Sequence, residues 1–326
     1  MKIAVLYQAA EPPVIDGIRK PMKEGGYSDS GADIAYCLKT NGIEVITPVA
    51  EPRAEQNFDW VFPDTYEGIE KAVSMGADTL WLNTVLFNGH PIEKFHGIGI
   101  IGQTPSDVEL LDNKAETNER LIRRGLKIAE HTILKNAEEY KGKFPGVLKP
   151  IRGRGSQGVK KCTDMPELVR ELDKALSSGR FGNRMMLEPY LEGEEITVTV
   201  FPDGETLPIV RRFNHKEGIA PYNGVVAVSQ NSSAVDVMNE ELELIERECA
   251  RVAKELKPKG VLRIDCRADG EGHYYMFDIN PKPNMTGEGR PSREGEDSLV
   301  MIGAKKKGMT YFDLLSRFMD FRWIME

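Results

Sequence analysis

The sequence predicts a parallel α/β unit followed by two α+β units. Strand and helix patterns alternate over roughly the first hundred residues, which is typical of a parallel open sheet. From Lys127 onward, short strands flank a glycine-rich loop, and the last third combines several strands with one long amphipathic helix. A chain of 326 residues has room for two or three compact units. We place their boundaries at residues 1–104, 105–187 and 188–326.

The elements of the first unit follow from the order of its apolar runs and breakers. Residues 2–7 are a continuous β-rich run, as expected for a buried parallel strand. Residues 30–40 should form a helix that ends at Asn41 and Gly42, because glycine accepts the left-handed conformation that ends many helices. In chain order, the remaining elements are a strand over 44–48, a helix over 65–74 and strands over 77–83 and 97–102.

The second and third units open with a long polar helix. Thr104 and Pro105 are typical of a helix start, and we expect one helix over residues 107–125 that carries Lys114. The helix over residues 236–256 repeats apolar residues at a helical period, so one of its faces should be buried. The other elements are strands over 146–150, 159–162, 185–188, 195–201, 207–213, 225–229, 261–267 and 273–280, and helices over 166–176 and 311–319.

Charge balance and cysteine usage narrow the function classes. The formal net charge is -8 and no basic run is longer than the lysines at 305–307, whereas nucleic-acid and anionic-membrane binding need clustered Lys and Arg. Four scattered cysteines indicate reduced, buried thiols. No stretch approaches the ~20 apolar residues that span a bilayer, and the first apolar run is too short for a signal peptide. We expect a cytoplasmic protein with small-molecule partners and without nucleic-acid or membrane partners; a homodimer stays open.

Residues 153–158 spell G-x-G-x-x-G, a pattern that also marks ordinary tight turns. A dinucleotide-binding loop needs a helix after it, but residues 159–162 look like a returning strand. Lys149 lies at the end of the preceding strand, and Arg152 and Arg154 add positive charge. A strand–loop–strand flap of this kind predicts a phosphate clamp, in which glycine amides approach phosphate oxygens and Ser156 adds a hydroxyl donor. The alternative is a solvated hairpin turn.

Apolar and polar residues alternate in two consecutive predicted strands. Arg263 and Asp265 share one face of the first strand, because strand side chains alternate between faces. Within residues 276–280 of the next strand, the even-numbered positions should share one face and the odd-numbered positions the other. About eight residues with two glycines separate the alternating runs, which predicts a hairpin.

Pairing of these strands would gather Asp265, Asp278 and Asn280 into one oxygen-rich patch. Hard oxygen ligands without His or Cys suit Mg²⁺, which takes its other ligands from phosphates and water. Arg263 beside them suits a reaction in which negative charge develops. The alternative is a surface hairpin whose charged residues form exposed ion pairs of little energetic value.

In this order, the motifs resemble the ATP-grasp superfamily, and specifically its D-alanine–D-alanine ligase branch. The resemblance covers nearly the whole chain and is strongest at residues 263–265, 278–281 and 284–286. Family members usually carry Glu at the position of Asp278; Asp keeps the charge with a shorter reach. The resemblance implies an ATP-grasp fold that follows an N-terminal parallel α/β domain.

The resemblance also implies an ATP site. Residues 187–195 are similar to the interdomain strand of the family, in which the Glu188 position and the backbone at Leu191 contact adenine and the Glu195 position holds the ribose hydroxyls. The lysines that match positions on the nucleotide phosphates are Lys114, Lys149 and, on a mobile loop, Lys216.

The resemblance further implies a reaction. A substrate carboxylate attacks the γ-phosphate of ATP, with Mg²⁺ (two ions, or Mn²⁺ instead) held by Asp265, Asp278 and Asn280. An amine then attacks the acyl-phosphate, ADP is the nucleotide product, and a new amide bond forms. The catalytic residues are expected to be Arg263, Lys149 and Ser156. The substrate-binding residues are expected to be Arg263, Asn280, Asn284, Ser298, Leu299, Arg290 and Arg293.

Departures from the family pattern argue for another substrate than D-alanine. Gly25 stands where the family has a glutamate for the first amino acid's ammonium, and Asn83 stands roughly where it has a histidine. The charged stretch 287–296 supplies Arg290 and Arg293, an arginine pair suited to a carboxylate or phosphate. We therefore expect a larger or more anionic amino acid or a small peptide.

Two other functions remain open at this point. One is a nucleotide-binding regulator without catalysis, although the retained Asp265, Asp278, Asn280 and Arg263 speak against it. The other is a dinucleotide site in the first unit, which the loop at residues 7–13 disfavours because it lacks the glycines for pyrophosphate approach.

Overall fold

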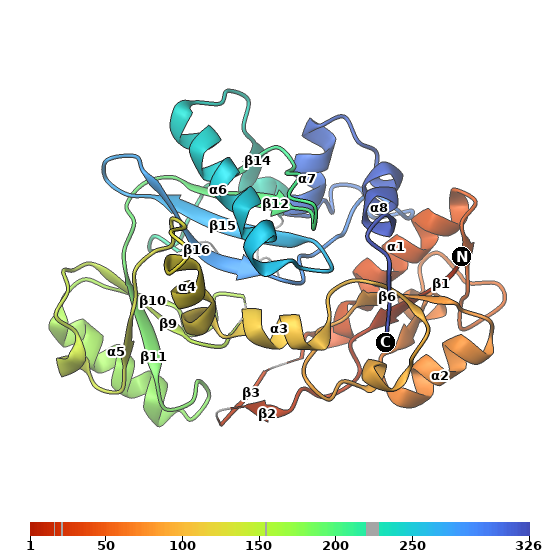
Figure 1. Ribbon diagram of the computed structural model, residues 1–326, viewed down its shortest axis with the longest axis horizontal. Helices are drawn as coiled ribbons and strands as arrows, with labels where there is room; N and C mark the ends of the chain where they lie inside the picture. Colours follow the sequence, from red (N-terminus) through yellow and green to blue (C-terminus); the bar gives the residue numbers. More distant parts are fainter. Residues whose placement is uncertain (16, 21, 154, 220–227) are drawn as a thin grey trace.

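The computed structural model describes residues 1–326 apart from residues 16, 21, 154 and 220–227. It contains one mostly parallel sheet and two antiparallel sheets, as the sequence predicts. Figure 1 shows the mostly parallel sheet near both chain ends and the two antiparallel sheets on the other side, with helix α3 between them. The division into three units at residues 104 and 187 stays a prediction.

The first sheet is centred on β1 (Lys2–Tyr7). Its strand order is β17-β7-β6-β1-β4, and β5 pairs with β1 beside β4. The other strands are β4 (Glu44–Val45), β5 (Val61–Pro63), β6 (Thr79–Asn83), β7 (Gly99–Ile101) and the antiparallel β17 (Trp323–Ile324). The helices that cover it are α1 (Ser28–Thr40) and α8 (Tyr311–Met319) on one face and α2 (Tyr66–Ser74) on the other. The sequence did not predict β5 or β17, because both are too short to show a period of their own.

The second sheet carries the glycine-rich flap. Its order is β10-β9-β11-β8, and helix α5 (Met165–Ser177) covers one face through Leu168 and Leu172. Its strands are β8 (Thr132–Leu134), β9 (Gly146–Pro150), β10 (Lys160–Cys162) and β11 (Met185–Pro189). Strand β10 returns antiparallel to β9, which confirms the strand–loop–strand flap and excludes a dinucleotide fingerprint in this loop.

The third sheet has the order β14-β13-β12-β15-β16 and packs against α6 (Glu240–Leu256). Its strands are β12 (Glu195–Val200), β13 (Val210–Arg212), β14 (Ser232–Ala234), β15 (Leu262–Ala268) and β16 (Tyr274–Asn280). Helix α7 (Leu299–Lys306) lies against this sheet and α8. Most of the strand expected at residues 225–229 lies outside the described residues, and residues 228 and 229 belong to a short 3-10 turn, η5 (Val228–Gln230).

The prediction of one continuous helix over residues 107–125 is wrong, because the chain breaks at Asn113. The chain forms two helices, α3 (Pro105–Asp112) and α4 (Lys114–Ile122), because Asn113 is extended and its side chain accepts a hydrogen bond from Glu116 N. Asparagine caps helices in this way more readily than it continues them. The break makes Lys114 the first residue of α4, and its backbone N–H donates to Ile151 O of the flap at 3.1 Å.

Short elements complete the fold. A two-stranded ribbon that the sequence did not predict follows β1, and no helix among the described residues is long and apolar enough to cross a membrane. These elements are β2 (Val14–Ile15), β3 (Ile18–Arg19), η1 (Glu24–Tyr27), η2 (Asn57–Asp59), η3 (Pro91–Lys94) and η4 (Ala137–Glu139).

Candidate active site

The predicted hairpin of β15 and β16 forms the base of the site. Asp265 lies opposite Asp278 and Arg263 lies opposite Asn280, so all these side chains share one face of the third sheet. Two carboxylates on directly opposed positions repel each other unless a cation lies near them. The sequence prediction that these residues come together is confirmed.

A β-bulge changes the expected facing of β16 beyond Asp278. Cys266, the residue after Asp265, lies opposite Met276, so Phe277 is the extra residue of the bulge. Met276 is therefore buried with Cys266 in the core under α6, and its predicted place beside Asp278 is wrong. The Phe277 carbonyl accepts a 2.8 Å hydrogen bond from Lys149 Nζ, which ties the second sheet to the third.

Asp265 is held by several donors at once. Arg263 donates through Nε and Nη2 to its two carboxylate oxygens, at 2.9 and 2.8 Å. Thr197 Oγ1 donates at 2.7 Å and Asn280 Nδ2 at 3.2 Å. Burial raises the pKa of Asp265, but Arg263, Arg212 and the Thr197 hydrogen bond together hold that pKa below its ordinary value. The arrangement fixes a charged carboxylate and a planar guanidinium in one orientation.

A second buried pair closes the site from the second sheet. Lys149 Nζ lies 2.7 Å from Glu188 Oε1, and the two side chains are only 6% and 5% exposed. Asn118 of α4 donates to the same Glu188 oxygen at 3.4 Å. Burial raises the pKa of Glu188 above its ordinary value, although Lys149 acts in the opposite direction.

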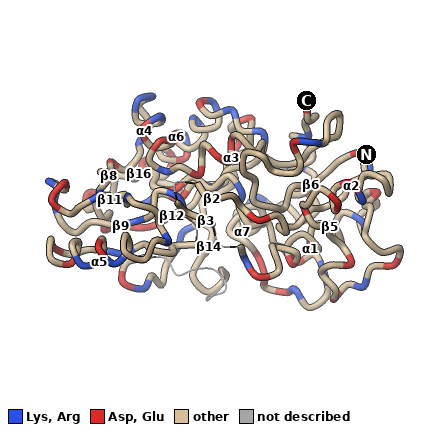
Figure 2. Tube along the Cα trace, turned by 90° about the horizontal axis from the view of Figure 1, so that it is seen from below, with Lys and Arg blue, Asp and Glu red and all other residues tan. Residues whose placement is uncertain are grey.

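Lys114 connects α4 to the acidic edge of β16. Its ammonium makes a short contact with Asp278 Oδ1, and both side chains are half-buried. Burial lowers the pKa of Lys114, but the carboxylates of Asp278, Asp112 and Glu188 together raise that pKa above its ordinary value. The charged groups of this cluster balance: the cations are Lys114, Lys149 and Arg263, and the carboxylates are Glu188, Asp265 and Asp278. Figure 2 shows such basic and acidic residues close together around β11, β12 and β16.

Glu195, at the start of β12, is the centre of a neighbouring cluster. His215 Nε2 lies 2.9 Å from its carboxylate, and Arg212 and Arg267 lie 3.4 and 3.7 Å away. Arg267 also donates to Gly193 O, Gly218 O and the Tyr190 hydroxyl. These contacts join two segments beside Glu195. One is the connection between β11 and β12, which includes Leu191, and the other is the loop that carries the exposed Lys216.

The oxygen set fits a hard divalent cation. Asp278 and Asp265 present carboxylates on one face, and Asn280 adds an amide oxygen from the opposed strand. Among the described residues no group of three or more His, Cys, Asp or Glu side chains is arranged to hold a metal. Two carboxylates and an amide suit Mg²⁺, which completes its shell with phosphate and water oxygens, better than Zn²⁺.

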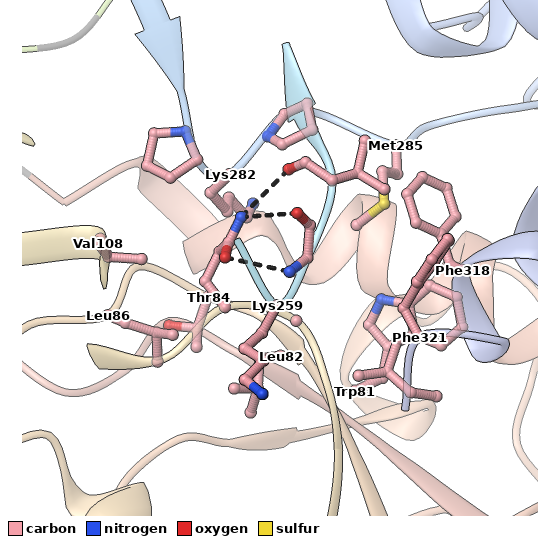
Figure 3. A pocket seen from close by; sticks show the side chains of 17 residues that line it. Trp81, Leu82, Thr84, Leu86, Val108, Lys259, Lys282, Met285, Phe318 and Phe321 are labelled. Carbon is pink, nitrogen blue, oxygen red and sulfur yellow. Dashed lines mark hydrogen bonds between the residues drawn. The ribbon is translucent and has the colours of Figure 1, made fainter. Parts of the chain in front are cut away.

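Of the predicted residues after β16, Asn284 lies in the segment that follows the strand, and Ser298 and Leu299 lie at the start of α7. Ser298 is buried and caps α7 by accepting from Met301 N at 3.2 Å, and Leu299 is the buried first residue of that helix. Asn284 donates to Thr286 Oγ1 at 3.2 Å. A small cavity of about 40 Å³ lies beside residues 281–285 and is lined also by apolar side chains of the first sheet and α8 (Figure 3).

The two arginines expected to bind substrate are occupied elsewhere. Arg290 Nε donates to Asp33 Oδ1 at 2.7 Å, and its other nitrogens donate to Ala54 O and Asp29 O. Arg293 Nη2 donates to Asp33 Oδ2 at 3.1 Å. Burial outweighs both guanidiniums and raises the pKa of Asp33. Because Asp33 is fully buried within α1, this cluster fastens residues 287–296 to the first unit, and Arg290 is a structural residue in this conformation.

Two other predicted residues are not drawn into the cluster. Ser156 is exposed at the tip of the flap, where its φ of 57° turns the chain, and Lys216 is exposed on its own loop. Arg154 lies outside the described residues, as do residues 220–223 of the mobile segment expected over 214–223. The roles of Ser156 and Lys216 stay predictions.

The sequence analysis missed Thr197 and Arg267, which contact the site, although the alternation of side chains along β12 and β15 could have identified both. Thr197 lies directly opposite Asp265 and shares its face with Glu195, two residues earlier in β12. Arg267 lies two residues beyond Asp265 in β15. Asn118, by contrast, has no sequence signal, because it reaches Glu188 only through the packing of α4 on the second sheet.

Comparison with known proteins identifies the fold and the family. One mostly parallel sheet is followed by two antiparallel sheets, which carry the glycine-rich flap and the charged β15–β16 hairpin. This is the arrangement of an ATP-grasp protein. Residues 118–320 match the family described as D-ala D-ala ligase C-terminus, and the chain belongs to this family. Over 176 residues the chain is 31% identical to the D-alanine–D-alanine ligase of Aquifex aeolicus (strain VF5); the alignment covers 53% of this chain and 55% of that protein. The chain thus spans about half the length of the curated relatives it matches.

Two solved structures show the same fold over the whole chain. D-alanine–D-alanine ligase from Bacillus anthracis complexed with ATP has a TM-score of 0.69 at 19% identity, over 98% of this chain and 96% of that chain. VanG D-Ala:D-Ser ligase from Enterococcus faecalis has a TM-score of 0.65 at 15% identity, over 98% of both chains. At these identities the likeness establishes the ATP-grasp fold alone.

Proposed function

We propose that this chain is an ATP-dependent carboxylate–amine ligase that forms an amide bond through an acyl-phosphate and releases ADP. The observation that carries the proposal is the balanced cluster of buried cations and carboxylates between the second and third sheets. Burying charge is costly, and well-packed apolar residues would stabilise the fold as well or better. Such a cluster is better explained by a ligand that brings both negative charge and a divalent cation.

ATP fits this cluster by charge and by position. Lys149 and Lys114 would contact phosphate oxygens, while Glu188 and the backbone at Leu191 would face the adenine. Glu195 would hold the ribose hydroxyls, and Lys216 would approach from its loop. The ATP complex of the Bacillus anthracis ligase, which shares this fold, supports the assignment.

Mg²⁺ supplies charge neutralisation at the phosphates when it is bound, and we propose two ions, with Mn²⁺ as a substitute. Asp265, Asp278 and Asn280 would hold them. Lys114, which pairs with Asp278 in this structure, would then be released toward the nucleotide. Asp278 would then keep a cation beside it in both states, with Mg²⁺ in place of the Lys114 ammonium.

Arg263 would stabilise the oxyanion that forms when the amine attacks. Asp265 takes its Nε and Nη2, and Nη1 makes no hydrogen bond with the described residues, so it can donate to a substrate oxygen. The flap, with Ser156 at its tip, would cover the phosphates and exclude water. No side-chain nucleophile takes part, since the substrate carboxylate is itself the nucleophile.

The substrates are proposed to differ from two D-alanine molecules. The matched family range begins at residue 118 and therefore omits the whole first unit, where Gly25 and Asn83 depart from the family pattern. Asn284, Ser298 and Leu299 would contact the amine substrate.

A panel of carboxylates and amines, assayed for ADP release with mass spectrometry of the products, tests the proposal. A ligase releases ADP only when both substrates are present, and an amide appears whose mass is the sum of the two substrates less one water. If the protein binds ATP but releases no ADP with any pair of substrates, it is instead a regulator on the same scaffold.

A further inference from the structure

One histidine that the proposed reaction does not use contacts the carboxylate expected to hold the ribose. His215 Nε2 lies 2.9 Å from Glu195 Oε2, and the two side chains are 16% and 4% exposed. Arg212 and Arg267 lie farther from the same carboxylate, at 3.4 and 3.7 Å. Because an ionised carboxylate only accepts hydrogen bonds, Nε2 of His215 carries a proton and donates. His215 therefore makes the shortest of the three contacts that orient Glu195.

The loop after β13 contains a tight turn. Asn214 and Glu217 have left-handed φ values of 57° and 51°, which residues other than glycine seldom adopt. Lys216 and Ile219 exchange backbone hydrogen bonds, with N···O distances of 3.0 and 2.9 Å. Strained backbone of this kind persists only where surrounding contacts hold it. Residues 214–219 therefore form a defined turn that depends on its contacts with the rest of the fold.

This turn is held to the third sheet on both sides of Lys216. After Lys216, Gly218 O accepts a 2.6 Å hydrogen bond from Arg267 Nη1 of β15. Before Lys216, His215 donates to Glu195 of β12. The place of the Lys216 backbone therefore depends on the contact between His215 and Glu195. The same contact would affect two parts of a nucleotide, because Glu195 is proposed to hold the ribose and Lys216 to approach the phosphates.

We propose that His215 is a positioning residue for the nucleotide, because it holds Glu195 in place for the ribose hydroxyls and Lys216 in place for the phosphates. The proposal rests on the proposed ATP site and adds the residue that couples its two halves. A carboxylate offers about four acceptor positions, so Glu195 can accept ribose hydroxyls beside His215. His215 acts as a hydrogen-bond donor and not as an acid or base, so a neutral donor of similar reach can replace it.

Nucleotide binding by matched variants tests the proposal. Calorimetry compares MgATP with its 2′-deoxy analogue, which reports on the ribose, and with AMP, which lacks the outer phosphates and so reports on Lys216. The variants are His215→Ala, His215→Gln, Lys216→Met and the double variant that combines His215→Ala with Lys216→Met. His273→Ala is the matched control, because His273 is 44% exposed and pairs with two other carboxylates, those of Asp269 and Glu271, at 3.8 and 3.7 Å.

His215→Ala should lower the preference for ATP over the 2′-deoxy analogue by about tenfold, as expected when a contact that orients a charged acceptor is lost. His215→Gln should restore most of that preference, and His273→Ala should match the parent. Lys216→Met should lower the preference for MgATP over AMP by about tenfold in the parent, but by no more than about twofold in the His215→Ala background, because Lys216 is no longer held in place there.

Three results would overturn the proposal: equal binding of ATP and its 2′-deoxy analogue by the parent, a parent-like ribose preference in His215→Ala, or an undiminished effect of Lys216→Met in that background. A loss in His215→Gln as large as in His215→Ala would also overturn it. ADP release is measured on the same samples with the substrate panel. Intact nucleotide preferences without turnover on any pair would contradict the ligase function alone, whereas a parent that binds no nucleotide would contradict both.

Discussion

Lys149 holds two sheets together through buried charge, and its replacement by methionine probes that role. Its ammonium contacts Glu188 Oε1 at 2.7 Å and donates to Phe277 O at 2.8 Å. Methionine keeps most of the side-chain length and removes the charge. In Lys149→Met, Glu188 stays buried at the end of β11 without its cation.

The expected loss of folding stability is large at neutral pH. Removing one partner of a buried ion pair costs about 3–5 kcal/mol, because the other charge remains desolvated. Glu188→Gln should cost a similar amount, and the double variant should lose less than the sum by about 1–3 kcal/mol. Lys174→Met, on the exposed face of α5, should lose less than about 0.5 kcal/mol.

The loss should also depend on pH. Burial already raises the pKa of Glu188, and removal of Lys149 raises it further. A carboxyl with a raised folded pKa contributes stability below its unfolded pKa, and that stability disappears as pH rises through the folded pKa. The deficit of Lys149→Met should therefore be smallest near pH ~5 and largest near pH ~8.

Urea unfolding followed by tryptophan fluorescence measures the parent and the four variants at both pH values. A loss below about 1 kcal/mol in Lys149→Met, or strict additivity in the double variant, would refute the description of Lys149 and Glu188 as a coupled buried pair.

Three further changes test other parts of the site. Asp278→Asn removes one ligand charge and the partner of Lys114, so turnover should fall at least about tenfold and need more Mg²⁺, while the exposed Asp173→Asn should match the parent in a magnesium titration. Asp33→Ala leaves Arg290 buried without its carboxylate and should cost about 3–5 kcal/mol in urea unfolding, with ATP affinity unchanged; a stable variant would return Arg290 to the substrate site. Glu195→Gln should reduce the preference for ATP over 2′-deoxy-ATP by about tenfold in calorimetry, and an equal preference in both proteins would remove Glu195 from the ribose.

The sequence could predict the parts of the site that follow from strand alternation. Arg263 and Asp265 on β15, with Asp278 and Asn280 on β16, needed only a period of two and a hairpin. The same alternation also predicts Arg267, two residues beyond Asp265, and Thr197, opposite Asp265 on β12. Local patterns were sufficient here because Arg263, Asp265, Asp278 and Asn280 all lie on the same side of the bulge at Phe277.

Features that depend on irregular backbone or on distant packing were beyond the sequence. The bulge at Phe277 breaks the period of two and frees the carbonyl that receives Lys149. The extended Asn113 breaks a helix whose polarity looked continuous. Arg290 binds Asp33, which is 257 residues away in the sequence. Because this partner cannot be identified from the local sequence, Arg290 was predicted to bind substrate. In each case a tertiary contact decides among conformations that the local sequence permits.

The most direct test of the proposed reaction follows the oxygen atoms of the donor. If a carboxylate attacks the γ-phosphate, the acyl-phosphate shares one carboxylate oxygen, and amine attack releases that oxygen in inorganic phosphate. With a donor labelled with ¹⁸O in its carboxylate, chosen from the ADP-release panel, mass spectrometry should find one ¹⁸O in the phosphate for each amide formed. Phosphate that carries only the oxygens of ATP and water would contradict the acyl-phosphate route and with it the ligase mechanism.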